Sequence, residues 1–464
     1  MIVRLYNSLT RRLDEVVPLD DRHVRMYACG PTVYRYAHIG NLRTFLLTDL
    51  VRRALEFEGY EVTLVMNITD VGHMTDEVSV TGRDKMQLAV DDEGLSAGEI
   101  AAKYTEAFLE DTRAIGIRPA HVYPRATGHI PEMLTLTQRL LEKGHAYEVG
   151  GTVYYDVRSF PEYGKLSGNT LEKLRAGHRQ ELEVDPSKRH HADFALWKNA
   201  GSSRLMKWDS PWGEGFPGWH IECSAMSMKY LGERFDIHTG GVDLIFPHHE
   251  DEIAQSEGSV GRQVVSIWVH GGHLRLKEQK MAKSSGNILR IGDLAATGLD
   301  PLSYRYLTFQ TRYRSEMDFS EEKMREADGV VKRLRQRMAG WGTPSATLGE
   351  EAKAYDERFR EAVGDDLNMP RAVVVLNELV SSGIPDGDKC ALLSSWDQVL
   401  GLDLERDVRE GWTPTDEVEE VVAERDAARS AKDFATADEL RNRLQAMGLE
   451  VMDTPEGTKV RPRR

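Results

Sequence analysis

The pattern of hydrophobic and polar residues predicts a strand, a helix and a second strand close to the N-terminus. Residues 23–29 read as a strand that ends in a Gly-Pro turn. An amphipathic helix is predicted over Leu42–Glu58, with apolar residues on one face and Gly59 as its stop. Residues 62–67 are almost entirely apolar, which is typical of a buried parallel strand. This unit predicts an open α/β sheet with a ligand site where the first strand ends.

The remaining pattern divides the chain further. From residue 300 it is helical almost to Trp396, and no internal repeat or low-complexity segment is present. The other predicted elements are a polar surface loop at Thr75–Ala97, helical sequence up to Gly116, a mixed insertion at 119–215, strands at 235–238 and 264–270, a linker at 402–416 and a final helix at Glu417–Met447.

Composition narrows the class of protein. With 464 residues, 40% of them hydrophobic, the chain can bury more than one core. No apolar run has the length of a membrane span and the N-terminus lacks a secretory segment, so we expect a cytoplasmic protein without a membrane partner. Three cysteines do not make a disulfide framework, so they are expected to be ligands or buried thiols. For Cys390 we expect a buried thiol.

The distribution of charge indicates where a nucleic acid would bind. The formal net charge of −15 disfavours phosphate binding over the whole surface. Basic residues nevertheless gather near the C-terminus, at Arg425, Arg429, Lys432, Arg441, Arg443 and 459–464. An acidic protein with such a basic edge can bind RNA there and repel it elsewhere.

The segment Ala37-His38-Ile39-Gly40-Asn41 lies between the first predicted strand and helix. His38 and Asn41 are three residues apart and face the same way on a first helical turn. The helix N-terminus offers amide donors and a positive dipole end to a phosphate group. A histidine at a helix start is also commonly a capping or surface residue, so the motif alone does not decide its role.

A second motif, Lys280-Met281-Ala282-Lys283-Ser284-Ser285-Gly286-Asn287, places two lysines among small residues. Such a cationic loop can close over a polyphosphate and neutralise charge as it develops. A solvated basic turn has the same composition. Taken together and in this order, the two motifs are similar to the two signatures of class I aminoacyl-tRNA synthetases.

Two cysteines, a histidine and a glutamate form a candidate zinc site. His248 and Glu252 are four residues apart and share a helix face, Cys29 ends the first strand, and Cys223 precedes a helix-like run at 224–231. Thiolate, imidazole and carboxylate are ligands that zinc prefers. These four residues converge only if the two halves of a nucleotide-binding fold meet. The alternative is that the cysteines are ordinary buried thiols and that His248 belongs to an ordinary polar helix start.

Over essentially its whole length the chain resembles bacterial cysteinyl-tRNA synthetases. The segments that carry the resemblance are 29–34, Asn67-Ile68-Thr69-Asp70, Gly218-Trp219-His220-Ile221-Glu222-Cys223, 235–238, Gly240-Gly241 with Asp243, Phe246-Pro247-His248-His249-Glu250, 365–372, 428–434 and 453–458.

The resemblance implies an α/β Rossmann-like catalytic domain with a parallel sheet and an inserted connective domain, followed by helical domains and a small C-terminal α/β domain. The predicted boundaries are 1–118 and 216–295 for the two halves of the catalytic domain, 119–215 for the insertion, 296–345 for a stem-contact region, 346–405 for the helical anticodon-side domain and 413–464 for the C-terminal anticodon-binding domain.

The resemblance also implies residue roles. The zinc ligands would be Cys29, Cys223, His248 and Glu252, and the cysteine pocket would be lined by Thr69, Trp219 and His238. The ATP-binding positions would be His38, Gly40, Gly240, Asp243, Trp268, Val269, Lys280 and Lys283. The catalytic positions would be His38, Asn41, Lys280 and Lys283, and the anticodon-reading positions would be Arg429, Asp438, Arg441 and Asp453.

The implied reaction joins L-cysteine to tRNA(Cys) through cysteinyl-adenylate, with ATP and Mg²⁺ as substrate and one Zn²⁺ per chain as cofactor. A thiolate is a better zinc ligand than a serine hydroxyl, so an editing domain is not expected. We expect the protein to act as a monomer.

Several positions depart from the family pattern and keep alternatives open. They are Asn41 and Ala282 in the two signature motifs, Val71-Gly72-His73 after Thr69-Asp70, and Phe434 near the C-terminus. They leave open a specialised second copy of the enzyme. A cysteine ligase that acts on an amino sugar shares the zinc site but has no use for residues beyond about 345. A non-catalytic zinc-binding RNA protein is a third reading, and it predicts damaged ATP motifs.

Overall fold

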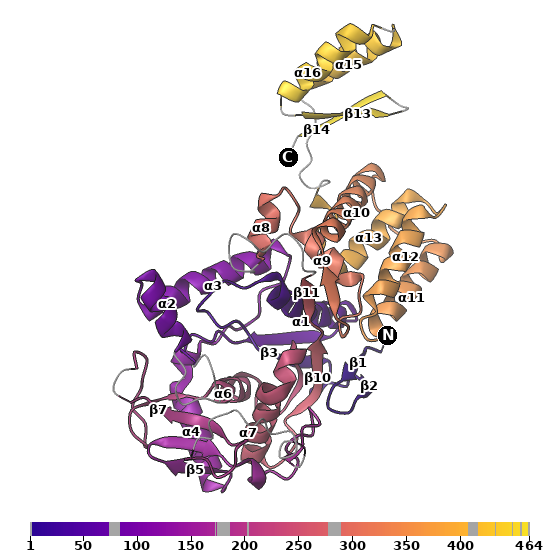
Figure 1. The fold of residues 1–464 in the computed structure, drawn as a ribbon. Coiled ribbons are helices and arrows are strands. Elements are labelled where there is room, and N and C mark those ends of the chain that lie inside the picture. The colour runs from indigo at the N-terminus through magenta and orange to yellow at the C-terminus, as the bar shows by residue number, and fades with distance from the viewer. Residues whose placement is uncertain are drawn as a thin grey trace. The chain divides into compact units, whose positions relative to one another are not determined.

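A computed structural model of the chain describes residues 2–73, 84–171, 173, 186–201, 204–276, 289–406, 416–431, 433–447, 449–454 and 457–462. The chain divides into two compact units (Figure 1), namely Met1–Arg337 with Trp341–Leu404, and Glu405–Arg464 with Met338–Gly340.

A four-stranded parallel sheet forms the centre of the large unit, in the order β10–β9–β3–β4. The strands are β3 (His23–Ala28), β4 (Glu61–Met66), β9 (Phe235–Gly241) and β10 (Val265–Gly271). In the register, Ala28 lies opposite both Met66 and Thr239. The residues that follow these strands therefore meet at one edge of the sheet. The predicted α/β class and the four predicted strands are confirmed.

Helices cover both faces of this sheet, with α1 (Ile39–Phe57) on one side and α6 (Trp219–Leu231) and α7 (Glu250–Val260) on the other (Figure 1). The helix predicted from Leu42 is confirmed and begins three residues earlier. The prediction that Cys223 precedes its helix is wrong, because α6 already begins after Gly218. A Cβ at Gly218 would lie 1.9 Å from the carbonyl oxygen of Ala195, so only glycine allows α6 to begin this close to the neighbouring strand.

The segment between β4 and α6 contains the mixed insertion. Its antiparallel sheet runs in the order β5–β6–β7–β8. Two helices precede the insertion, α2 (Lys85–Glu93) and α3 (Ala97–Ala114). The elements that follow them are η1 (Ala126–His129), α4 (Ile130–Glu142), β5 (Ala146–Val149), β6 (Thr152–Tyr155), η2 (Val157–Ser159), β7 (Phe194–Asn199) and β8 (Gly215–Pro217).

The surface loop predicted at Thr75–Ala97 is wrong over the residues of α2. The Asp84 carboxylate accepts the backbone N–H groups of Met86 and Gln87, and Gly94 ends the helix with φ +68°. A polar sequence is thus made helical by its two caps. Residues 75–83 of that prediction lie outside the described residues.

Beyond β10 the large unit is mainly helical, as predicted. Its elements are β11 (Leu274–Leu276), α8 (Ile291–Ala296), α9 (Leu302–Phe309), β12 (Met317–Phe319), α10 (Glu321–Gly340), α11 (Glu350–Gly364), α12 (Met369–Ser381) and α13 (Asp386–Leu400). An N-terminal hairpin of β1 (Arg4–Asn7) and β2 (Arg12–Glu15) joins β10 through the Asn7 side chain, which donates to the carbonyl of Ser266. Between β9 and α7 lie η3 (Val242–Leu244) and η4 (Ile245–His249).

A buried ion cluster ties α1 to the helical segment. The Asp49 carboxylate lies 2.6 Å from Arg53 and 2.6 Å from Arg305, and all three side chains are buried. Arg53 also donates to the carbonyl of Gln398 in α13. Burial alone would raise the pKa of Asp49, but Arg305 and Arg53 more than offset this and lower it. The helix whose start lies at the sheet edge is therefore anchored at its middle.

The C-terminal unit consists of α15 (Asp416–Ser430), α16 (Phe434–Ala446) and an antiparallel hairpin of β13 (Leu449–Thr454) and β14 (Gly457–Pro462). The single helix predicted at Glu417–Met447 is therefore wrong. The chain breaks where Asp433 caps α16 and accepts the N–H of Thr436 at 3.2 Å. The small core of this unit comprises Val418, Val421, Leu440, Leu444, Leu449 and Val451.

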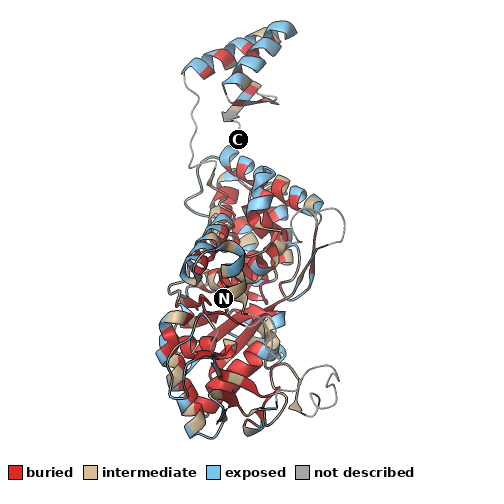
Figure 2. Cartoon of the chain, turned by 60° about the vertical axis from the view of Figure 1, so that its left-hand side comes forward, coloured by how far each residue is buried: buried red, intermediate tan, exposed pale blue. Residues whose placement is uncertain are grey.

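Buried residues fill the parallel sheet and the helices packed against it, and they continue into the helical segment beyond residue 300 (Figure 2). Within the part of the chain that the structure describes, no helix has the length and apolar character needed to cross a membrane. The six domain boundaries expected from the sequence stay predictions.

Candidate active site and metal centre

The four sequence-predicted zinc ligands lie together at the edge of the sheet. Cys29 directly follows β3, Cys223 lies in α6, His248 belongs to the turn before α7, and Glu252 lies on α7. One ligand atom from each lies within 4.8 Å of the other three. All four residues are less than 9% exposed.

The spacing of these donor atoms fits a tetrahedral zinc ion. Sulfur ligands about 2.3 Å from such an ion are about 3.8 Å apart, and the Sγ atoms of Cys29 and Cys223 are 3.7 Å apart. For one sulfur and one oxygen ligand the expected separation is about 3.5 Å, and Cys29 Sγ lies 3.5 Å from Glu252 Oε1. His248 Nε2 lies 3.0 Å from the same oxygen. The donor set and its spacing both suit zinc.

The electrostatics of this cluster favour a bound cation. Burial, followed by the neighbouring Cys223 thiol, raises the pKa of Cys29 well above its usual value. Burial would also raise the pKa of Glu252, but His238 and His248 lower it overall. Two thiols and a carboxylate buried together cannot all ionise without compensating positive charge, and a divalent cation supplies that charge.

A chain of hydrogen bonds orients the His248 ring. Its Nδ1 lies 2.8 Å from Nδ1 of His220, whose Nε2 lies 3.3 Å from Oδ2 of Asp251. Burial lowers the pKa of His220 well below its usual value, so this ring is neutral. If Nε2 of His248 ligates a metal, its Nδ1–H donates to His220, and His220 in turn donates to Asp251. The tautomers along this chain are therefore compatible with metal binding through Nε2.

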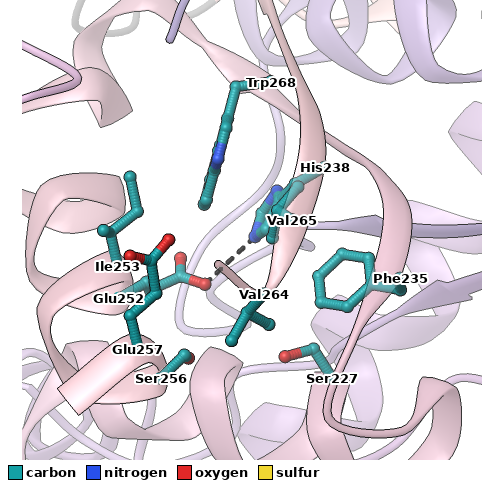
Figure 3. Close-up of a pocket in the computed structure, with 10 residues that line it drawn as sticks. All are labelled: Ser227, Phe235, His238, Glu252, Ile253, Ser256, Glu257, Val264, Val265 and Trp268. Atoms are coloured by element: carbon teal, nitrogen blue, oxygen red, sulfur yellow. Dashed lines mark hydrogen bonds and ion pairs between the residues drawn. The ribbon is translucent and has the colours of Figure 1, made fainter. Parts of the chain in front are cut away.

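A second set of donors overlaps the first and comprises Cys29, His238, His249 and Glu252. His238 Nε2 lies 3.0 Å from Oε2 of Glu252, the bond dashed in Figure 3. His249 Nε2 lies 3.3 Å from Cys29 Sγ, and its Nδ1 lies 2.8 Å from Nε2 of His270. Burial lowers the pKa of His249, and that of His270 to about 3, so both rings are neutral. These histidines surround the first set on the side of β9 and β10.

A small cavity lies behind Glu252, between α7 and the sheet (Figure 3). Its volume of about 10 Å³ is close to that of a single water molecule. It is lined by Ser227, Phe235, His238, Glu252, Ile253, Ser256, Glu257, Val264, Val265 and Trp268.

We call Cys29, Cys223, His248 and Glu252 the metal set. The structure places the three residues predicted to line a cysteine pocket around it. The Thr69 hydroxyl donates to Glu222 at 2.9 Å, and Thr69 is 1% exposed. The Trp219 ring lies 4.2 Å from the His248 ring and is half-buried. His238 bonds Glu252, as above, and is buried.

The start of α1 holds the first signature motif. His38 is the N-cap, and its Nδ1 accepts the backbone N–H of Asn41 at 3.2 Å, while Asn41 Oδ1 accepts the N–H of His38. Burial and then Arg35 lower the pKa of His38. Because Nδ1 accepts a bond, the proton of the neutral ring lies on Nε2. A Cβ at Gly40 would lie 2.9 Å from the His38 ring, so glycine leaves room for the imidazole.

The other predicted ATP positions differ in exposure. Asp243 is exposed, and its charge partly offsets the lowering of the His38 pKa, which places it near the start of α1. Gly240 is buried against His249, since a Cβ there would lie 2.5 Å from the ring. Trp268 and Val269 are buried in β10, and the Trp268 ring stacks on His238 at 4.5 Å. Their predicted contact with ATP stays a prediction. Lys280 and Lys283 lie outside the described residues.

The predicted anticodon-reading residues lie in the C-terminal unit. Arg429 forms an ion pair with Asp453, and the charge of Arg441 also lowers the pKa of Asp453. The largest cause of the lowered Asp453 pKa is the hydrogen bond that Arg425 donates to this carboxylate. Arg425 is 2% exposed and also donates to Thr458. Asp438 is exposed on α16, one turn before Arg441. Three of the four predicted residues therefore lie close together, and Arg425 supports them from the core.

The structure also reveals site residues to which the sequence gave no role. The polar neighbours of the metal set include Asn67, His73, His220, Glu222, His249, Asp251 and His270. His220, Glu222 and His249 lie within the quoted motifs, so the signal was present. The choice between His248 and His249 as ligand depends on which ring nitrogen faces the thiols, which no spacing rule reveals.

Comparison with known proteins identifies the family. The family model for the class I (C) tRNA synthetase catalytic domain matches residues 15–329, and that for the cysteinyl-tRNA ligase anticodon-binding domain matches residues 415–461. This chain is a member of the cysteinyl-tRNA synthetase family. A cysteine–tRNA ligase of Salinibacter ruber is 42% identical over 98% of this chain and 97% of its own length. One from Treponema denticola is 41% identical over 98% of each chain.

Solved structures support the fold assignment. A methionyl-tRNA synthetase of Mycobacterium tuberculosis, bound by methionyl-adenylate, superimposes with a TM-score of 0.55 at 15% identity. The match covers 84% of this chain and 92% of that one. The resemblance stated from the sequence and the class I fold are confirmed. The amino-sugar ligase receives no support, because the relatives span nearly the full chain, including the C-terminal unit. Nothing in these comparisons favours a specialised second copy.

Proposed function

We propose that this chain activates L-cysteine with Mg-ATP and transfers it to tRNA(Cys). In this proposal one Zn²⁺, held by Cys29, Cys223, His248 and Glu252, selects the substrate thiol. The observation that carries the proposal is the convergence of four buried donors, from three separate segments, at the spacing of a tetrahedral zinc site. Membership of the family supports the choice of amino acid and tRNA.

Selection of cysteine would depend on the surroundings of the metal set. When bound, zinc supplies a Lewis acid that favours sulfur over a hydroxyl oxygen and stabilises a thiolate at neutral pH. The chain contributes the walls of the pocket, for which we propose Thr69, Trp219 and His238. The neutral His220 would keep the proton of the His248 ring on Nδ1, so that Nε2 stays available as a ligand.

Activation would take place at the start of α1. The substrate carboxylate oxygen attacks the α-phosphorus of ATP, the bond from that phosphorus to the bridging oxygen breaks, and pyrophosphate leaves with the bond electrons. The chain positions the phosphates and neutralises their charge. We assign this role to the Nε2–H of His38, Asn41 and the helix N-terminus, with Lys280 and Lys283, which lie outside the described residues. Gly240 and Asp243, with Trp268 and Val269, would bind the nucleoside.

Transfer would complete the reaction. A terminal ribose hydroxyl of the tRNA attacks the carbonyl carbon of cysteinyl-adenylate, loses its proton and displaces AMP. For recognition of the anticodon we propose Arg429, Asp438, Arg441 and Asp453, because Arg and Asp can pair with the edges of unstacked bases. Phe434 is 65% exposed at the start of α16, where its ring can stack on a base.

Pyrophosphate exchange followed by charging tests the proposal. We expect cysteine-dependent exchange between ATP and pyrophosphate, then charging of tRNA(Cys). Exchange without tRNA charging, but with transfer to an amino sugar, would favour the amino-sugar ligase. The absence of exchange would favour a non-catalytic RNA-binding protein. The monomeric state and the cytoplasmic location stay predictions.

A further inference from the structure

A buried carboxylate connects two segments beside the proposed cysteine pocket. Glu222, in the first turn of α6, is 0% exposed. Its Oε2 accepts the Thr69 hydroxyl at 2.9 Å, and its Oε1 lies 2.6 Å from Nε2 of His73. An ionised carboxylate is an acceptor only, so the Nε2–H of His73 donates to it. His73 is itself 5% exposed, so both partners of this contact are buried.

The contact continues towards the metal set through Asn67. The Asn67 side-chain amide donates to the Thr69 hydroxyl at 2.9 Å. Its carbonyl oxygen accepts the backbone N–H of Gly30 at 2.8 Å and lies 3.8 Å from Cys223 Sγ. The Thr69 hydroxyl therefore donates its proton to Glu222 and accepts the Asn67 amide with one lone pair. Among the contacts of the described residues, its second lone pair is the group left to accept an N–H of the substrate.

The backbone holds His73 in place from the other side. Its carbonyl accepts the N–H of Lys85, the first residue of α2, at 2.9 Å. A Cβ at Gly72 would lie 2.2 Å from the Asp84 carboxylate, so glycine lets the cap of α2 approach this closely. Asp84 pairs at 2.7 Å with Arg204, whose side chain is 6% exposed. The backbone at Gly72 and His73 is thus held against the start of α2, with the His73 imidazole beside Glu222.

Trp219 provides a second link between His73 and the metal set. Its ring lies 6.4 Å from the His73 ring and 4.2 Å from the His248 ring. A change at His73 therefore reaches the pocket both through Glu222 and through the indole that packs between the two histidines.

We infer that His73 is a positioning residue for cysteine. By donating to Glu222 it fixes the direction of the Thr69 hydroxyl, so that Thr69 presents an acceptor to the substrate. This inference rests on the proposed function and assigns a role to a residue to which the sequence gave none. Loss of the donor leaves Oε1 of a buried carboxylate without this bond, so Glu222 and Thr69 reorient.

The test compares His73→Asn with His73→Gln in pyrophosphate exchange. A glutamine amide can reach the position of Nε2, whereas an asparagine amide ends about 2 Å short of it. For His73→Asn we expect the KM for cysteine to rise about tenfold, the size of effect seen when a residue that orients a binding group is removed. The KM for ATP and the zinc content should stay unchanged. For His73→Gln we expect a KM for cysteine within about twofold of wild type.

A control variant separates this role from general loss of a buried histidine. His129 is 6% exposed and bonds the carbonyl of Arg125 and the hydroxyl of Tyr230. His129→Asn is expected to lower the melting temperature without changing the KM for cysteine.

Two outcomes would overturn the inference. One is an unchanged KM for cysteine in His73→Asn, and the other is an equal rise in the KM for cysteine and for ATP. If wild-type protein shows no cysteine-dependent exchange, the proposed function fails instead, so the two failures are distinct.

Discussion

The metal set of the large unit and the charged cluster of the C-terminal unit, which comprises Arg429, Arg441 and Asp453, differ in burial and in the sequence separation of their members. Cys29 and Glu252 are separated by 223 residues and are both buried. Arg429 and Asp453 are separated by 24 residues, and their side chains are 38% and 39% exposed. In the buried set the charges act at low dielectric and the neighbours fix each donor. On the surface, water and salt screen the ion pair, so it can open for a partner. The comparison suggests that selection of the amino acid depends on rigidity and selection of the tRNA on exposure.

Cys223→Ser should give the largest effect. The serine hydroxyl is a poor zinc ligand at neutral pH, so we expect cysteine-dependent exchange to fall strongly. The fall should exceed the roughly 10–100-fold loss that is typical when a hydrogen-bond partner of a metal ligand is removed. ATP binding should change little. Exchange kinetics, zinc content by elemental analysis and ATP titration would measure the three quantities. Equal losses in cysteine activation and ATP binding would contradict a role for the metal in holding the thiol.

The third cysteine offers a matched control. Cys390 is 3% exposed, and its thiol donates to the carbonyl of Gly342, far from the metal set in the sequence. Cys390→Ser keeps a donor of similar size, so exchange activity and zinc content should match wild type within about twofold.

Deletion of residues 413–464 should give the next largest effect and separate the two regions. Adenylate formation should persist, since the large unit has its own core. The kcat/KM for tRNA(Cys) should fall by at least about a hundredfold, because each lost base contact costs about 1–3 kcal/mol. Exchange and charging assays on the same preparation would measure this split. Unchanged charging would remove the anticodon assignment.

His220→Phe probes the rigidity of the buried region. Phenylalanine keeps a ring that packs edge-on against Phe194, as His220 does, but removes the bond to His248. We expect zinc affinity to fall about 10–100-fold, as found for outer partners of metal ligands. A competition titration with a zinc chelator would measure the change. Wild-type affinity would show that the hydrogen-bonded chain does not support the site.

Arg429→Ala and Arg425→Ala should give the smallest effects and sharpen the contrast within the C-terminal unit. Arg425 is buried and bonds both Asp453 and Thr458, so its loss should lower the melting temperature of that unit. Arg429 is half-exposed, so its loss should spare stability and lower the kcat/KM for tRNA(Cys) about tenfold. Calorimetry and charging kinetics would test this pair. Reversed effects of the two substitutions would reverse the assigned roles.

Local elements of the fold were predictable where the pattern was strong. Strands β3, β4, β9 and β10 and helix α1 follow from apolar runs and a helical period. Predictions were wrong where a cap outweighed the pattern. Asp84 starts a helix in a polar stretch, and Asp433 splits what reads as one C-terminal helix. Each depends on backbone N–H groups that donate to one capping side chain, a contact that periodicity does not register.

The candidate site was predictable in its residue types more than in its network. The four zinc donors came from a family resemblance, and the structure brings them together. The histidine chain and the Glu222–His73 contact did not come from the sequence, although both lie in or beside quoted motifs. The segment Val71-Gly72-His73 read only as a departure from the family pattern. Its contact with Glu222 exists only when α6 packs beside the end of β4.

By itself, the sequence determined the strand–helix–strand unit, the buried character of the strands and the soft, zinc-preferring chemistry of two thiols, an imidazole and a carboxylate. Only the tertiary structure decided which histidine nitrogen faces the thiols and which neighbours bond it. The reason is that these choices depend on contacts between segments about 150 to 220 residues apart. Such contacts form only when a twisted parallel sheet and the helices on its two faces pack into one core.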